Sequence, residues 1–262
     1  MENPPANSSS PVIEMNEVAF GTLQDVERVV MENVNWKVAP GEYWVVGGMH
    51  GSGKRDLISL TAGLMPPLRG TYRLFGSEMP LYGDEQLAQR LRLGMVFDNG
   101  NLLHQLNVHE NLALPLRYHR DLGWQEIEER VKTMLELAEL TPFEKTMPGA
   151  LDHHWQKRAG LARALMLEPE VLLVDHALSG LDFRQSNWFL KFFDQLSAGH
   201  EFCQKRPMTL IATAEDLRPW RNPHCHFAFV KEKQLFTVGH RPQLTCHPEP
   251  LVKELLAEPF TT

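Results

Sequence analysis

The chain has 262 residues, of which 43% are hydrophobic, 23% charged and 9% aromatic, and this ordinary globular composition excludes collagen-like, coiled-coil and mainly disordered proteins. A net charge of −7 argues against a broad basic face for nucleic acid, so no nucleic-acid partner is expected. The sequence contains no run of about 18 apolar residues, the length that a membrane-spanning helix needs. The spacing of the cysteines is that of neither a metal site nor a disulfide framework, which favours a reducing cytosol.

The chain begins with a segment that favours disorder and continues as alternating strands and helices. Residues 1–11 are rich in Pro, Asn and Ser and lack the features of a signal peptide, so we expect a disordered leader there. In chain order the expected elements are strands at 13–20, 29–38 and 43–46, a helix at 56–63, strands at 71–75 and 93–97, helices at 124–140 and 155–167, a strand at 171–175, a helix at 187–196, a strand at 209–213, a hairpin over 227–238 and a closing helix at 251–258. This alternation predicts an α/β core with a helical insertion between about 99 and 167.

A glycine-rich loop follows the third strand and precedes the first helix. Its pattern, Gly48-x-x-x-x-Gly53-Lys54, is that of a phosphate-binding loop, in which glycines turn backbone N–H groups inward and the lysine adds a positive charge. A hydroxyl group after the lysine would ligate Mg²⁺, but this position holds Arg55, whose guanidinium cannot bind a metal and would repel one. The expected cofactor-binding residues are Gly48, Gly51, Ser52, Gly53, Lys54, Arg55 and, from a second motif, Asp175.

Two further motifs identify the family that this chain resembles. The apolar strand at 171–175 ends in Asp175, a carboxylate of the kind that holds Mg²⁺ through water, and Ser179-Gly180-Leu181-Asp182 follows it. Together with the loop, they resemble the Walker B strand and D-loop of ATP-binding-cassette (ABC) ATPases, and the order of elements agrees from about 13 to 259. The segments 96–117 and 247–256 are most similar to the ATPase subunits of MCE-associated (Mla-type) lipid transporters.

The resemblance implies a fold, a subcellular localisation and binding partners. The implied fold is an α/β P-loop NTPase of the ABC ATPase type, with a RecA-like core, an N-terminal antiparallel β part and a helical subdomain over about 99–167. It implies one domain over 12–262 that ends in a hairpin and a helix over about 225–259. The implied protein is cytoplasmic, peripheral to the inner face of the membrane, bound to an integral membrane permease and to a second ABC subunit in a homodimer or heterodimer. Its implied ligand is ATP or ADP.

Several positions that carry chemistry in this family hold different residues here. The glutamate that polarises the attacking water corresponds to His176, the Q-loop glutamine to Asp98 and the switch histidine to Glu215. The aromatic residue that would stack on adenine corresponds to Thr22. A histidine could still accept a proton, but its reach and geometry differ from those of a glutamate.

The family signature is altered as well. Its serine and two glycines correspond to Asp152, His153 and His154, where Asp152 is expected to cap the following helix and the histidines obstruct a close approach of phosphate to the backbone. In ABC dimers each nucleotide lies between the loop of one subunit and the signature of the other. These residues, with Ser179 and Asp182 of the D-loop, are therefore expected to face the partner. Because both the loop side and the signature side are altered in this chain, neither a homodimer nor a heterodimer would contain an intact nucleotide site.

These losses favour a non-hydrolysing or very slow pseudo-ATPase that has a structural or regulatory role in a membrane transporter. A lipid is the candidate transported substrate, and no catalytic residue is assigned. Arg55 is expected to replace the charge of Mg²⁺ by pairing with Asp175 or with Asp98, so Mg²⁺ is not bound normally and no metal ligand is assigned. Two alternatives stay open: an active ABC ATPase with altered motifs, and a soluble nucleotide sensor or scaffold that serves no transporter.

Overall fold

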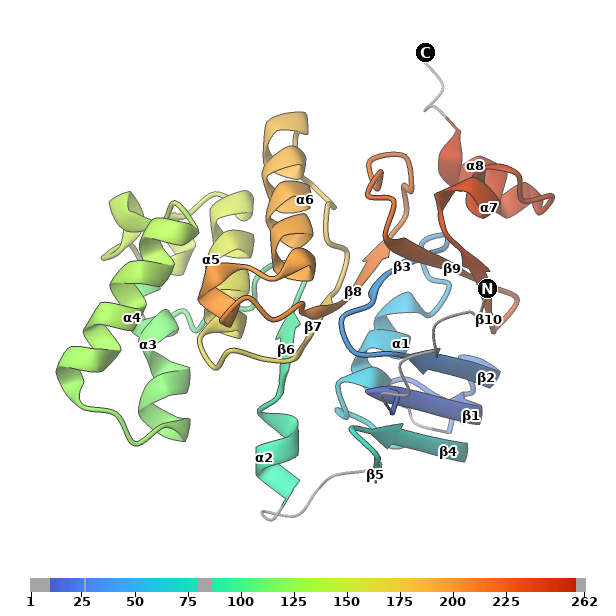
Figure 1. Ribbon diagram of the computed structural model, residues 1–262, viewed down its shortest axis with the longest axis horizontal. Coiled ribbons are helices and arrows are strands. Elements are labelled where there is room, and N and C mark those ends of the chain that lie inside the picture. The colour runs from blue at the N-terminus through green and yellow to red at the C-terminus, as the bar shows by residue number, and fades with distance from the viewer. Residues whose placement is uncertain (1–9, 26, 80–85, 258–262) are drawn as a thin grey trace, which may run out of the picture.

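The computed structural model describes residues 10–25, 27–79 and 86–257 and arranges them around two β-sheets (Figure 1). Most of the leader expected over 1–11, and the last residues of the C-terminal segment expected up to 259, lie outside the described residues. Within the described ranges, no helix is long and apolar enough to cross a bilayer.

The larger sheet forms the centre of the molecule. Its six strands lie in the order β10-β9-β3-β8-β7-β6, and neighbours pair in parallel except β10 and β9, which form an antiparallel hairpin. The strands are β3 (Tyr43–Gly47), β6 (Leu93–Val96), β7 (Val171–Val174), β8 (Thr209–Ala214), β9 (Cys225–Lys231) and β10 (Gln234–Gly239). Because β3, β6, β7 and β8 run in the same direction, the segments that follow them meet at one edge of the sheet.

The smaller sheet is antiparallel and packs beside the first helix. Its order is β2-β1-β4-β5. Leu57, Ile58 and Leu60 of α1 are fully buried in a core cluster that contains side chains from both sheets. The elements are β1 (Ile13–Phe20), β2 (Met31–Val38), α1 (Lys54–Thr61), β4 (Arg69–Leu74) and β5 (Ser77–Glu78).

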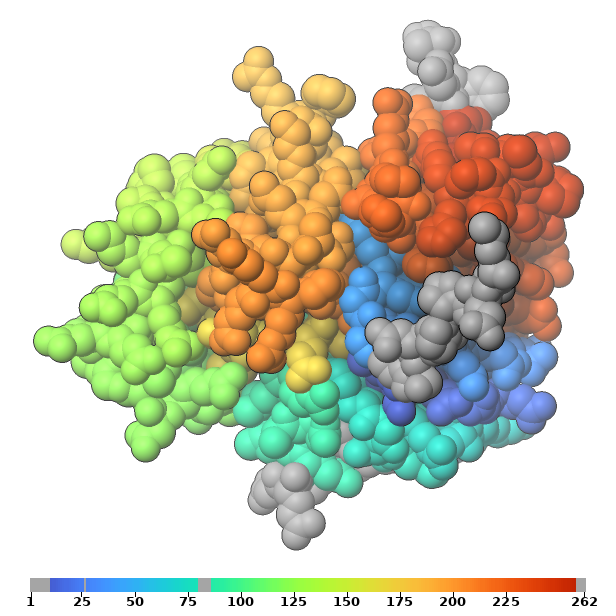
Figure 2. Space-filling view, viewed as in Figure 1, coloured from blue at the N-terminus to red at the C-terminus, as the bar shows by residue number. Residues whose placement is uncertain are grey.

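Three helices, α3, α4 and α5, form a lobe at one end of the molecule, and α6 lies beside α5 (Figure 1). Figure 2 shows the part of the lobe that contains α3 and α4, in green, projecting at the left of the surface. The remaining helices are short, and α7 contacts the β9–β10 hairpin. The helices are α2 (Leu87–Arg90), α3 (Val108–His119), α4 (Trp124–Leu137), α5 (His153–Leu165), α6 (Phe183–Ala198), α7 (Arg241–Thr245) and α8 (Pro250–Leu256).

The α/β class and the antiparallel N-terminal part agree with the sequence prediction, whereas two helices differ from it. The helix expected from 187 begins at Phe183, because the Asp182 carboxylate accepts a hydrogen bond of 2.9 Å from the backbone N–H of Gln185. The sequence pattern did not separate α3 from the general helical insertion. Its start is fixed by a capping box between Asn107 and Glu110.

Candidate functional site

The carboxyl end of β3 leads into the glycine-rich loop and then into α1. Gly51 and Gly53 have φ angles of 73° and 98°, which glycine adopts without strain. A Cβ at Gly53 would lie 2.6 Å from Cγ1 of Val30, and one at Gly48 would lie 2.8 Å from Oγ of Ser52. The glycines therefore let the loop fold tightly in front of the α1 N-terminus, where unpaired N–H groups favour an anion.

The Lys54 side chain lies inside this loop. This side chain is 2% exposed, and its ammonium donates hydrogen bonds of 2.6 Å to the Gly48 carbonyl and 2.7 Å to the Met49 carbonyl, with Oγ of Ser52 at 3.4 Å. Burial lowers the pKa of Lys54 below its ordinary value, because desolvation disfavours the charged form. An anion that enters the loop must therefore compete with backbone carbonyls for the ammonium.

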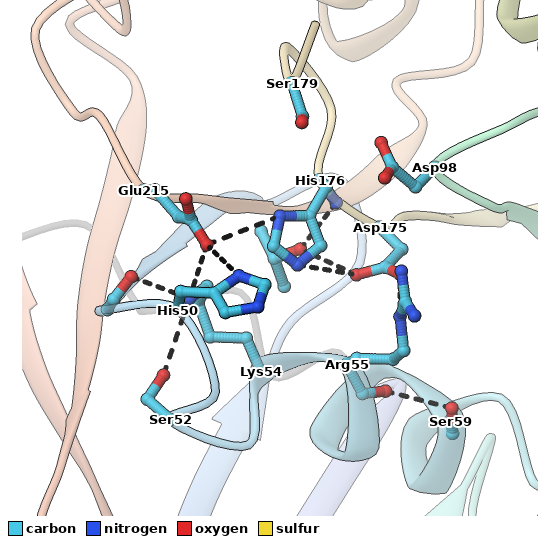
Figure 3. A network of polar contacts seen from close by, with 12 residues as sticks. His50, Ser52, Lys54, Arg55, Ser59, Asp98, Asp175, His176, Ser179 and Glu215 are labelled. Atoms are coloured by element: carbon cyan, nitrogen blue, oxygen red, sulfur yellow. Dashed lines mark hydrogen bonds and ion pairs between the residues drawn. The ribbon is translucent and has the colours of Figure 1, made fainter.

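Arg55 forms an ion pair with the carboxylate at the end of β7. Its Nε donates a hydrogen bond of 2.8 Å to Oδ2 of Asp175, whose side chain is 1% exposed (Figure 3). The hydroxyl of Thr213 lies 3.2 Å from the other oxygen, Oδ1. The hydrogen bond to Asp175 raises the pKa of the Arg55 guanidinium. The contact expected between Arg55 and Asp175 is confirmed.

Asp98 has a different partner, so the alternative pairing with Arg55 is wrong. Its Oδ1 lies 3.1 Å from Nζ of Lys157, a lysine in α5 that is 0% exposed. The same ammonium donates to the carbonyls of His176 at 2.7 Å and Ser179 at 3.2 Å. Burial lowers the pKa of Lys157. One buried charge thus joins α5 to the segments that follow β6 and β7.

Glu215 follows β8 and faces the loop. Its Oε1 lies 3.2 Å from Nδ1 of His50, 3.9 Å from Nζ of Lys54 and 3.9 Å from Nδ1 of His176 (Figure 3). His176 adopts a left-handed backbone with φ of 46° directly after Asp175. This carboxylate therefore lies among three nitrogen-bearing groups on the side of the loop that an incoming phosphate would approach.

These groups surround a cavity of about 300 Å³. The residues of the loop and the start of α1 form one wall, and Asp98, His176, Ser179 and Glu215 form the other. The structure thus brings together the three altered positions, one D-loop residue and the expected binding residues other than Gly48 and Asp175, which do not line the cavity.

The expected partner-facing residues do not line this cavity, apart from Ser179. Asp152 occupies the N-cap position of α5, but its side chain makes no capping hydrogen bond, so that part of the prediction is wrong. His153 is exposed, and its ring lies against Gly180, where a Cβ would be 3.3 Å from Cε1 of His153. Asp182 instead caps α6, and burial lowers the pKa of His154.

Sequence reasoning missed His50 and Asp56, which line the cavity, and Lys157, which binds Asp98 beside it. His50 occupies a variable position of the loop pattern, and its 91% exposed ring gives no burial signal. Lys157 follows the altered signature within a helix, where a lysine is usually a solvated residue. Only its burial beside Asp98 distinguishes it.

The residues at the expected metal position do not fit Mg²⁺. Mg²⁺ requires several oxygen ligands in near-octahedral geometry. Here Oδ2 of Asp175 accepts a hydrogen bond from Arg55, and Oδ1 lies within hydrogen-bond distance of Thr213. In the described part of the chain, no group of at least three His, Cys, Asp or Glu side chains is arranged to hold a metal ion.

The sequence and the fold are similar to those of known ATP-binding proteins. A family model described as ABC transporter matches residues 31–179. The chain is 27% identical to the intermembrane phospholipid transport system ATP-binding protein MlaF of Escherichia coli K12, over 95% of this chain and 90% of MlaF. It is 29% identical to a probable ribonucleotide transport ATP-binding protein, mkl, of Mycobacterium leprae, over 87% of this chain and 64% of mkl. It is 35% identical to the methionine import ATP-binding protein MetN 2 of Paraburkholderia xenovorans, over 88% of this chain.

The chain therefore spans less than two thirds of mkl and of MetN 2, at 64% and 59% of their lengths. Among solved structures, the dimeric ATP-binding cassette MJ0796 bound to ADP and Pi has a TM-score of 0.73 and 23% identity, over 85% of this chain and 96% of MJ0796. The cbiO1 subunit of the Clostridium perfringens transporter complex cbiONQ has a TM-score of 0.74 and 20% identity, over 94% and 93% of the two chains. Both share the fold described above.

Proposed function

Since this chain belongs to the ABC transporter family of ATP-binding domains, we propose that it is a non-hydrolysing or very slow pseudo-ATPase subunit with a structural or regulatory role. The observation that carries the proposal is the 2.8 Å ion pair between Arg55 and Asp175, at the position where a metal would be held. A guanidinium supplies positive charge and N–H donors there, but it cannot act as the Lewis acid that a divalent metal ion provides.

Other features of the cavity support the absence of hydrolysis. The residue after Asp175 is a histidine in a left-handed conformation, and the Asp98 carboxylate is held by Lys157. Positioned proton transfer is typically worth about 10²–10⁴-fold in rate, and here it would be lost together with the metal. Because residues that act as a unit are not independent, restoring one of them is not expected to restore turnover.

We propose that the partner is the cytoplasmic side of a membrane permease, and that the subunit, a single domain over 12–262, pairs with a second ABC subunit. A groove of about 580 Å³ lies between β6, α3 and α5. Leu103 and Tyr118 line it and are 43% and 77% exposed, which supports a docking role. Of the three relatives, MlaF alone is covered over more than two thirds of its own length, at 90%, and we therefore propose a lipid as the transported substrate.

The proposal predicts that MgATP turnover by the purified chain equals that of its Lys54→Ala variant. Phosphate release should stay at the background rate in both, because no metal and no base act on a bound nucleotide. Release that depends on Mg²⁺ and disappears in Lys54→Ala would instead assign the chain to active ABC ATPases. Co-purification from native membranes should recover a multi-spanning protein, whereas recovery of cytosolic partners alone would favour a sensor or scaffold.

A further inference from the structure

The candidate cavity has two walls that differ in charge. On one wall lie the N-terminus of α1, the buried Lys54 side chain and the Arg55 guanidinium, together with the Asp56 carboxylate. On the other lie the carboxylates of Glu215 and Asp98, which are 44% and 32% exposed. Glu215 comes within 3.9 Å of the Lys54 ammonium, so an anion chain that extends beyond this lysine meets the carboxylate.

Mg²⁺ does not screen the repulsion between a bound phosphate and the acidic wall, because the metal position does not fit this ion. The charge that compensates a bound phosphate must therefore come from the first wall alone. A short phosphate chain can place its oxygens on the loop N–H groups and Lys54 while staying clear of the second wall. A longer chain carries further negative charge, which must lie toward Glu215 and Asp98 and is repelled by them.

Building on the proposed function, we infer that this cavity is a metal-independent site for a phosphate or diphosphate group, and that its acidic wall discriminates against triphosphates. Glu215 is the main discriminating residue, because it lies closest to the lysine and its carboxylate is held in place by His50. Asp98 contributes less, because its charge is compensated by Lys157.

Isothermal titration calorimetry on the full chain tests this inference, with two pairs of probes in EDTA: ADP against ATP, and pyrophosphate against tripolyphosphate. In each pair we expect the shorter anion to bind roughly tenfold more tightly. This factor is the loss of affinity expected from one repulsive contact between like charges at a half-exposed site. Neither member should require Mg²⁺ for binding. Tighter binding of the longer anion, binding that requires Mg²⁺, or no binding of any probe would overturn the inference.

The Glu215→Gln variant tests the acidic wall directly. It should raise the affinity for ATP roughly tenfold and change the affinity for ADP much less, because it removes one charge from the side that only the longer anion reaches. The matched control is Asp216→Asn, since the Asp216 carboxylate binds Arg218 and does not line the cavity. Equal changes in the two variants, or none in Glu215→Gln at an unchanged melting temperature, would contradict the role of Glu215.

Phosphate release measured on the same samples separates the two proposals. A chain that prefers ADP and releases no phosphate satisfies both. A chain that releases no phosphate but binds ATP more tightly than ADP contradicts only the discrimination, whereas Mg²⁺-dependent release contradicts the proposed function itself.

Discussion

Lys157→Ala should lower the free energy of unfolding by about 3 kcal/mol, the range expected when a buried charged donor with several acceptors is removed. The variant leaves the Asp98 carboxylate and the carbonyls of His176 and Ser179 without their shared donor. For a chain of this size, a loss of about 3 kcal/mol corresponds to a fall of roughly 6–12 °C in Tm. Urea and thermal unfolding followed by circular dichroism measure both quantities.

Lys132→Ala is the matched control, because Lys132 is an exposed lysine on helix α4 of the same lobe. Its effect should stay within about 0.5 kcal/mol. Asp98→Ala should cost less than Lys157→Ala, since the ammonium keeps its two carbonyl acceptors. A Lys157→Ala variant as stable as the control would mean that the ammonium does not hold these segments together.

The contacts of Lys157 also indicate how the cavity is joined to the groove. Asp98 lines the cavity, and three residues further along the chain Asn101 lines the groove. Between them Gly100 lies so close to α5 that a Cβ at Gly160 would be 2.5 Å from the Gly100 Cα. The segment 98–101, which connects the cavity to the groove, therefore packs closely against α5.

The sequence predicted the elements that motifs mark and missed those that depend on packing between distant segments. The end of β3, the glycine-rich loop and the end of β7 follow from local patterns, and they place Arg55 near Asp175 at one edge of a parallel sheet. The partner of Asp98 could not be predicted in this way. Lys157 lies 59 positions away, and its position depends on the close contact between Gly100 and α5.

The helix boundaries show the same limit on a smaller scale. The helix expected from 187 begins four residues earlier because Asp182 and Gln185 cap each other, and a polar start of this kind carries no apolar periodicity. Conversely, Asp152 has the residue type and position of a cap, yet its side chain does not accept the hydrogen bond. Residue type thus indicates which caps are possible, and the local side-chain rotamer decides which ones form.

Arg55→Ala should lower the free energy of unfolding by about 2 kcal/mol, or roughly 4–8 °C in Tm. Breaking a fully buried ion pair typically costs about 3–5 kcal/mol, but the Arg55 side chain is 62% exposed and its contribution is correspondingly smaller. The cost arises mainly at Asp175, which is 1% exposed and would keep the Thr213 hydroxyl and, at 3.9 Å, Nε2 of His176. Arg184→Ala, at an exposed arginine in the first turn of α6, is the control and should have little effect.

The variant Arg55→Ser tests whether Arg55 prevents Mg²⁺ from binding at this position. It removes the guanidinium and places a hydroxyl next to Lys54, which is the arrangement that favours Mg²⁺ in phosphate-binding loops. A ligand at about 100 times its Kd stabilises the folded state by about 2.7 kcal/mol. We therefore expect excess Mg²⁺ with ADP to raise the Tm of Arg55→Ser by several degrees above its value with ADP alone. In the native chain, adding Mg²⁺ to ADP should leave the Tm unchanged. If Mg²⁺ stabilised the native chain equally, Arg55 would not close the metal position, and the pseudo-ATPase proposal would lose the observation on which it rests.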